Sequence, residues 1–179
     1  MSGHTPYYSD ERPILDPASG GRMFYFDKSD PRVIFGDRRT VEPVALGEGR
    51  NERLFEVTPD MLTDFRALDF PDASFSLVIF DPPHSTRAGH TGWLATKYGT
   101  LTGTDWRADL RAGFAECFRV LKPHGTLAFK WAETDIPLRE VLALTDEKPV
   151  VGEMLPKRSG THWVLFLKAD RTYHYNQEG

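Results

Sequence analysis

Short apolar runs alternate with turn residues along most of the chain and predict the strands of a sheet. The runs lie at residues 13–21, 31–37, 61–65, 75–81, 125–133 and 161–168. Residues 105–121 instead place apolar side chains three or four positions apart, which predicts a helix with one buried face. That face carries Leu110, Phe114, Cys117, Phe118 and Leu121. A shorter helical pattern covers residues 138–144.

The order of these runs indicates a mainly parallel α/β sheet in one domain. Only residues 20–30 separate the first two strands, so we expect an abbreviated first helix there. A chain of 179 residues suits a single core, and 40% apolar with 27% charged residues is ordinary for a globular protein. We expect an N-terminal arm over 1–12, one domain over 13–169 and a C-terminal tail over 170–179. Trp163 alternates with apolar neighbours and is predicted to lie in the core.

Composition and charge narrow the functional classes. A net charge of -4 argues against strong non-specific attraction to nucleic acid. It does not exclude a local basic face, and a solvated surface is the alternative interpretation of the basic clusters. These clusters comprise Arg22, Lys28, Arg32, Arg38 and Arg39, then Lys157 and Arg158. No apolar run approaches the roughly 20 residues that cross a bilayer, and no secretory signal pattern opens the sequence, so we expect a cytoplasmic protein without membrane contact. The single cysteine predicts a core thiol, and the histidine spacing predicts no metal site.

The stretch VIFDPPH at residues 78–84 ends a strand on a carboxylate. Two adjacent prolines cannot donate ladder hydrogen bonds, and each restricts the residue before it, so the sheet must end at Asp81. Ligands of open α/β sheets bind at the carboxyl ends of the strands. Asp81 is therefore a candidate ligand-facing residue, with a strand-ending turn as the alternative.

A second group of candidate ligand-binding residues follows the first strand. Asp16 closes that strand, Ser19, Gly20 and Gly21 form a turn that lets backbone approach a ligand, and Asp37 closes the second strand 21 residues after Asp16. This order is typical of a nucleotide-binding half, in which a carboxylate can accept both ribose hydroxyls. The pattern is not GxGxxG, because Arg22 stands where a further glycine would help a pyrophosphate approach, so a dinucleotide is disfavoured.

Taken together, residues 13–131 resemble the class I S-adenosylmethionine-dependent methyltransferases. ILDPASGG is similar to the DPFxGxG form of their first motif, and DFRALDFPDASFSLVIFDPPH to the stretch that enters their fourth strand. DPPH resembles the [DNS]PP[YFW] motif of enzymes that methylate amino nitrogens of nucleic-acid bases, and FRVLKPHGTLAFKW the turn into the fifth strand. Small DNA methylase-like proteins of phages and mobile elements are the most similar group.

The resemblance implies a three-layer Rossmann-like fold with a mostly parallel seven-stranded sheet and an antiparallel C-terminal strand. It implies S-adenosylmethionine as the cofactor. The residues implied to bind it are Asp16, Pro17, Ala18, Ser19, Gly20, Asp37, Asp64, Phe65 and Asp81, with Asp64 on the adenine side. The residues implied to act in catalysis are Asp81, Pro82, Pro83 and His84.

The implied substrate is an exocyclic amino nitrogen of a nucleobase, adenine N6 or cytosine N4, in DNA in preference to RNA. Such a nitrogen is a poor nucleophile because its lone pair is delocalised into the ring. The Asp81 carboxylate and the Pro82 carbonyl can hold both amine hydrogens and aim the lone pair at a methyl group. Two departures from the family pattern matter: Arg22 replaces a small residue, and His84 replaces the aromatic residue that would stack on the base.

Other readings stay open. The acceptor can be a glutamine amide or a small-molecule amine, and an inactive cofactor-binding module that recruits a partner is a third possibility. No target-recognition domain is evident, so selectivity must come from loops 85–104 and 153–160, from substrate shape or from a partner. We expect a monomer or a homodimer. A small enzyme of this kind is expected to prefer unstacked bases. Candidate stacking or basic residues are Trp93, Lys97, Tyr98, Trp106 and Arg107, for which core packing of Trp106 is the alternative.

Overall fold

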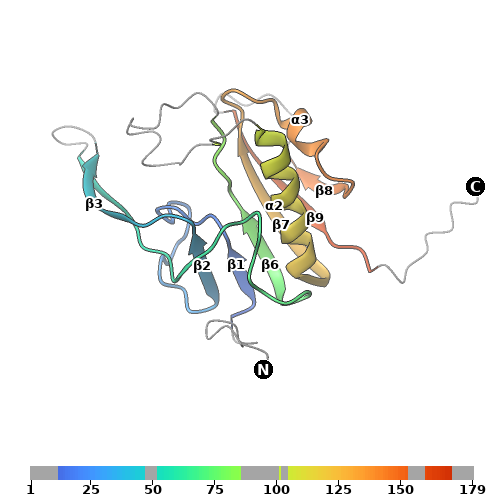
Figure 1. Ribbon diagram of the computed structural model, residues 1–179, viewed down its shortest axis with the longest axis horizontal. Coiled ribbons are helices and arrows are strands. Elements are labelled where there is room, and N and C mark those ends of the chain that lie inside the picture. The colour runs from blue at the N-terminus through green and yellow to red at the C-terminus, as the bar shows by residue number, and fades with distance from the viewer. Residues whose placement is uncertain (1–11, 47–51, 86–100, 102–104, 153–159, 171–179) are drawn as a thin grey trace, which may run out of the picture.

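The computed structural model describes residues 12–46, 52–85, 101, 105–152 and 160–170, and Figure 1 shows their arrangement. The strands are β1 Ile14–Asp16, β2 Val33–Asp37, β3 Val41–Leu46, β4 Arg53–Val57, β5 Met61–Leu62, β6 Phe75–Phe80, β7 Leu121–Ala132, β8 Pro149–Gly152 and β9 Thr161–Leu167. The helices are α2 Trp106–Val120 and α3 Leu138–Leu142. None of the helices in the described part of the chain has the length and apolar character that a membrane crossing requires.

Seven of the strands form one sheet in the order β5-β2-β1-β6-β7-β9-β8. Strand β9 runs antiparallel to both of its neighbours, and the other pairs are parallel. This confirms the predicted α/β class and the mostly parallel seven-stranded sheet. Each of the predicted runs contains a strand, whereas β8 was not among them because all four of its residues are exposed and carry no alternating pattern.

Both described helices pack on the same face of the sheet. The N-terminus of α2 is capped by Asp105, whose side chain accepts the Ala108 N–H at 3.0 Å. The predicted buried face is confirmed, and Cys117 is a fully buried core thiol. Gly113 lets this helix approach β6 closely, because a Cβ there would lie 2.6 Å from the Phe80 ring. Helix α3 ends two residues before the predicted pattern, at Leu142.

The connection between β1 and β2 is not helical, so the predicted abbreviated helix is wrong. Residues 17–32 form successive turns, and Gly20 and Arg22 have φ values of 49° and 52°, which interrupt any helix. The next crossover is a separate two-stranded ribbon, β3 paired with β4, which extends away from the sheet in Figure 1. The described residues therefore supply helices to one face of the sheet only, and turns rather than helices cover part of the other.

Trp163 was predicted to lie in the core, and this prediction is wrong because its side chain lies on the face of the sheet that no described helix covers. Along β9, Val164 and Phe166 point toward the helical layer and are 2% and 1% exposed. Trp163 and Leu165 point to the opposite face and are 39% and 36% exposed. Alternation along a strand fixes this outcome, because neighbouring side chains must lie on opposite faces of the sheet.

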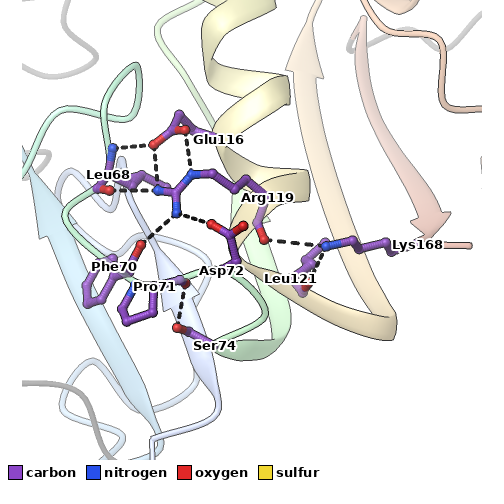
Figure 2. A network of polar contacts seen from close by, with 9 residues as sticks. All are labelled: Leu68, Phe70, Pro71, Asp72, Ser74, Glu116, Arg119, Leu121 and Lys168. Atoms are coloured by element: carbon purple, nitrogen blue, oxygen red, sulfur yellow. Dashed lines mark hydrogen bonds and ion pairs between the residues drawn. The ribbon is translucent and has the colours of Figure 1, made fainter. Parts of the chain in front are cut away.

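Arg119 joins the end of α2 to the segment that leads into β6, as Figure 2 shows. Its guanidinium donates to the carbonyls of Leu68 at 2.8 Å and Phe70 at 2.7 Å and pairs with Glu116 and Asp72. Glu116 also accepts the Leu68 N–H at 2.6 Å. The two charged side chains therefore fix the loop before β6, and with it the strand that ends at the DPPH segment.

Candidate active site

A cavity of about 280 Å³ opens at the carboxyl ends of the central strands. Its lining joins the turn after β1, the end of β2, the DPPH segment after β6 and one side chain of β7. The lining residues are Pro17, Ala18, Ser19, Gly20, Gly21, Met23, Phe24, Asp37, Arg38, Arg39, Phe65, Asp81, Pro82, Pro83, His84 and Lys130. The turn after β1 with Asp37 and the DPPH segment, both found in the sequence, thus border one cavity.

Most of the residues predicted for the site lie in this lining. The exceptions are Asp16 and Asp64. Asp16 is fully buried behind the turn, and Asp64 pairs with Arg66 at 2.5 Å, an interaction that lowers the pKa of Asp64. Arg66 also contacts Asp109 of α2 at 3.0 Å. Asp64 is therefore part of an ion-pair network that joins the loop to the helix, and it does not line the cavity.

The turn after β1 is built around Asp16. Its carboxylate accepts the Ala18 N–H at 3.1 Å and the Tyr25 hydroxyl at 2.8 Å. Burial raises the pKa of Asp16 to about 7, against the opposing effect of these two hydrogen bonds. The Ser19 N–H is held by the Gly36 carbonyl at 2.8 Å, which closes the turn against β2.

Two features of this turn suit a bound ligand. The Ser19 hydroxyl oxygen is buried and has no hydrogen-bond partner among the described residues, although it borders the cavity. Gly21 must be glycine, because a Cβ there would lie 2.6 Å from the Phe55 ring of β4. The ribbon β3–β4 therefore supports the turn from behind, and the orphaned hydroxyl can bond a polar group in the cavity.

Asp37 closes β2 at the cavity and is 4% exposed. Its carboxylate accepts the Gly20 N–H at 3.0 Å and pairs with Arg39 at 3.1 Å. Asp37 therefore fixes the turn as well as bordering the cavity. The Arg39 backbone N–H also donates to it at 2.9 Å, so any hydroxyl that Asp37 accepts would share the carboxylate with these donors.

The DPPH segment carries an ion pair that the sequence did not suggest. Phe80, the last residue of β6, pairs in register with Phe129 of β7, so Asp81 just beyond β6 lies beside Lys130 within β7. The Lys130 ammonium donates to Asp81 Oδ2 at 2.6 Å. Burial raises the pKa of Asp81, and the charge of Lys130 opposes that rise.

His84 lies at the outer end of this segment. Its ring is edge-on to Trp131, with centroids 6.3 Å apart, and its carbonyl accepts the Thr134 hydroxyl at 3.1 Å. Burial lowers the pKa of His84, which favours the neutral imidazole over the charged one. The His84 ring borders the cavity, and a histidine ring can stack on a planar group.

Arg22, the departure from the first motif, turns away from the cavity. It donates to the carbonyls of Lys28 at 2.6 Å and Thr58 at 2.7 Å, and its guanidinium lies 3.9 Å above the Phe35 ring. It also pairs with Asp60 at 3.1 Å. Arg22 therefore stabilises the turns that replace the first helix.

The predicted recognition residues fall partly outside the described residues. Trp93, Lys97 and Tyr98 lie there, as do Lys157 and Arg158 and most of loops 85–104 and 153–160. Trp106 packs against the core with Arg107 over its ring at 4.2 Å, which favours the packing interpretation. Arg38 and Arg39 are the basic pair that borders the cavity.

The described ranges place no three acidic, histidine or cysteine side chains together as a metal site would require. A scan of the sequence against protein-family models and a search of curated proteins give no match. Solved structures do match. A TehB-like SAM-dependent methyltransferase from Corynebacterium glutamicum has a TM-score of 0.53 at 12% identity, covering 88% of this chain and 80% of that chain. The chain has the fold of the S-adenosylmethionine-dependent methyltransferases.

Two further structures are similar at lower scores. A SAM-dependent methyltransferase from Methanosarcina mazei has a TM-score of 0.49 at 14% identity, covering 91% of this chain and 95% of that chain. A 1,6-didemethyltoxoflavin-N1-methyltransferase from Burkholderia thailandensis, solved with S-adenosylhomocysteine, has a TM-score of 0.46 at 17% identity, covering 88% and 71%. At 12% identity the Corynebacterium structure establishes the fold alone, so the activity must be argued from the cavity.

Proposed function

We propose that this protein is an S-adenosylmethionine-dependent methyltransferase that acts on the exocyclic amino nitrogen of a nucleobase, adenine N6 or cytosine N4. One observation carries the proposal: a single cavity joins the turn at residues 17–21 to the DPPH segment at residues 81–84. The first is the usual ligand side of such a fold, and the second begins with a carboxylate beside a rigid carbonyl. A methyl donor and an amine acceptor would thus meet in one space.

The lining fits the cofactor. Pro17, Ala18, Ser19 and Gly20 form the turn that borders the cavity, and Phe65 supplies an apolar wall. Asp37 would present its carboxylate to the ribose hydroxyls. The buried Ser19 hydroxyl would gain the partner that it lacks among the described residues. Asp16 would act from behind, by holding the turn through Ala18. When bound, S-adenosylmethionine supplies an electrophilic methyl group.

The acceptor side would work by positioning. Asp81 and the Pro82 carbonyl would accept the two hydrogens of the amino group, which localises the lone pair on the nitrogen. Asp81 would also take the proton that the amino nitrogen releases once it is methylated. Pro83 would keep the segment extended, and His84 would stack on the base.

We favour nucleic acid, with DNA preferred to RNA, because DPPH resembles the amino-methyltransferase motif and Arg38 and Arg39 border the cavity. Flipping a base out of a duplex costs a few kcal/mol, so we expect a preference for single-stranded, mismatched or looped substrates. A homodimer would supply more binding surface than a monomer.

A glutamine side-chain amide is the second candidate acceptor. His84 offers a smaller ring than the tyrosine or tryptophan of the family motif, and a small planar amide needs less stacking surface. The same Asp81 and Pro82 acceptors serve either NH₂ group. A small-molecule amine and an inactive cofactor-binding module are the remaining alternatives.

Labelled methyl transfer separates these acceptors. Purified protein is incubated with labelled S-adenosylmethionine and a cell lysate, which is then divided into nucleic-acid, protein and small-molecule fractions. We expect label in nucleic acid, lost in Asp81→Ala, with cofactor binding retained by calorimetry. Label in the protein fraction would favour the amide, and cofactor binding without label in any fraction would favour the inactive module.

A further inference from the structure

Lys130 is the one lysine in the cavity lining that the structure describes, and the proposed chemistry leaves it without a role. It lies in β7, two residues before that strand ends, opposite Trp163 of β9 in the register. Its ammonium lies 5.0 Å from the centroid of the Phe24 ring, which also lines the cavity. The side chain is 23% exposed, so its charge is partly removed from water.

The ion pair constrains what can enter the acceptor end. Lys130 bonds Asp81 through Oδ2, and an ammonium carries three N–H groups, so its contact with Asp81 leaves donors directed elsewhere. An acceptor amine that approaches Asp81 must come within reach of this ammonium. A group with no acceptor atom beside its amine would leave a partly buried charge poorly solvated, which is costly.

We propose that Lys130 selects the acceptor by donating a hydrogen bond to the atom beside the amino group, so that Asp81 and Lys130 together recognise an amidine edge, H₂N–C=N. In adenine that atom is ring nitrogen N1, and in cytosine it is N3. The inference rests on the proposed function and deepens it by naming the edge of the base that is recognised.

The same pair excludes a class of acceptors. Alkylamines are cations at neutral pH, so they bring a second positive charge next to Lys130 and present no acceptor atom. A glutamine amide, H₂N–C=O, keeps the donor–acceptor order and remains compatible. Lys130 is thus a specificity-determining residue: its ammonium contacts the base edge, while methyl transfer itself depends on Asp81.

Base analogues test this directly. Single-stranded oligonucleotides carry either the methylated base, its analogue without the ring nitrogen (1-deazaadenine or 3-deazacytosine), or a control altered away from that edge (7-deazaadenine or 5-methylcytosine). Initial rates give kcat/KM for the wild type and for Lys130→Met, which keeps the length of the side chain without the charge. Lys130→Arg restores a donor, and thermal unfolding checks that each variant folds.

A site built around a hydrogen-bond donor rejects analogues that lack the acceptor atom by large factors in kcat/KM. Because Lys130 is partly exposed, we expect a smaller factor here. We therefore expect the wild type to lose at least about tenfold in kcat/KM on the deaza analogue and little on the control. Lys130→Met should treat parent and analogue alike, and Lys130→Arg should recover part of the discrimination. Comparing enzyme variants across both substrates cancels the intrinsic reactivity of each base.

Two results would overturn the inference while leaving the proposed function intact: equal wild-type rates on parent and deaza analogue, or full discrimination retained by Lys130→Met. The absence of transfer to any nucleobase would instead overturn the proposed function, and with it the base edge named here.

Discussion

Asp16 offers a buried carboxyl whose titration should be measurable in the stability of the whole protein. It is fully buried, and both of its oxygens are engaged, by the Tyr25 hydroxyl and the Ala18 N–H. Asp16→Asn keeps the shape and one acceptor oxygen but cannot ionise. The perturbation therefore removes one titration from the folded protein.

The sign follows from the direction of the shift. Burial raises the pKa of Asp16 to about 7 from 3.8, so the folded state holds this proton more tightly than the unfolded state. Its stabilising contribution is complete below about pH 4 and is lost as the pH rises toward 7. The full difference corresponds to about 4 kcal/mol of unfolding free energy, of which about 3 kcal/mol falls between pH 5 and 8.

Urea unfolding of both proteins at pH 5 and pH 8 is the assay. The other ionisable groups are common to the two proteins, so their contributions largely cancel in the difference. The unfolding free energy of wild type minus that of Asp16→Asn should be about 3 kcal/mol smaller at pH 8 than at pH 5. A difference that stays constant between these pH values would refute the raised pKa.

Three further predictions concern the cavity and its support. Asp81→Ala should abolish methyl transfer while calorimetry shows nearly unchanged S-adenosylmethionine affinity, whereas Asp81→Asn keeps an acceptor oxygen and some activity; full activity of the alanine variant would make DPPH only a turn. Ser19→Ala should weaken cofactor binding about tenfold because one hydrogen bond is lost. Ser76→Ala, at an exposed position, is the control and should bind the cofactor as the wild type does. Equal affinities for the wild type and both variants would remove Ser19 from the site. Arg119→Met should lower the unfolding free energy by about 2 kcal/mol, because its hydrogen bonds to two carbonyls are lost. Arg111→Met, on the exposed side of the same helix, is the control and should change it little. Equal urea midpoints for the two variants would contradict the network in Figure 2.

The strands and the buried face of α2 could be predicted because each depends on local periodicity. Asp81 was placed at a strand end by the two prolines that follow it, and the turn at Ser19, Gly20 and Gly21 by its two glycines and the preceding Asp16. These are short-range constraints, which a single sequence carries. The two halves of the cavity were therefore identified before their spatial relation was known.

Long-range register accounts for what was missed. Lys130 reaches Asp81 only because β6 and β7 pair with Phe80 opposite Phe129, and nothing local to residue 130 specifies that pairing. The ribbon β3–β4 and the turns over residues 17–32 replace helices that the fold would otherwise carry. Trp163 lies in an apolar run, but its exposure depends on whether a second helical layer covers that face. The signal for Lys130 was its alternation in FKWAE, which places it on the face opposite Phe129 and Trp131.

Nucleoside mass spectrometry tests the central claim most directly. Single-stranded DNA and RNA are incubated with the protein and S-adenosylmethionine bearing a trideuterated methyl group, then digested to nucleosides. The account predicts a trideuteromethyl group on adenine N6 or cytosine N4, more in DNA than in RNA, and none with Asp81→Ala. Label confined to ring nitrogens or carbons, or undiminished in Asp81→Ala, would contradict it.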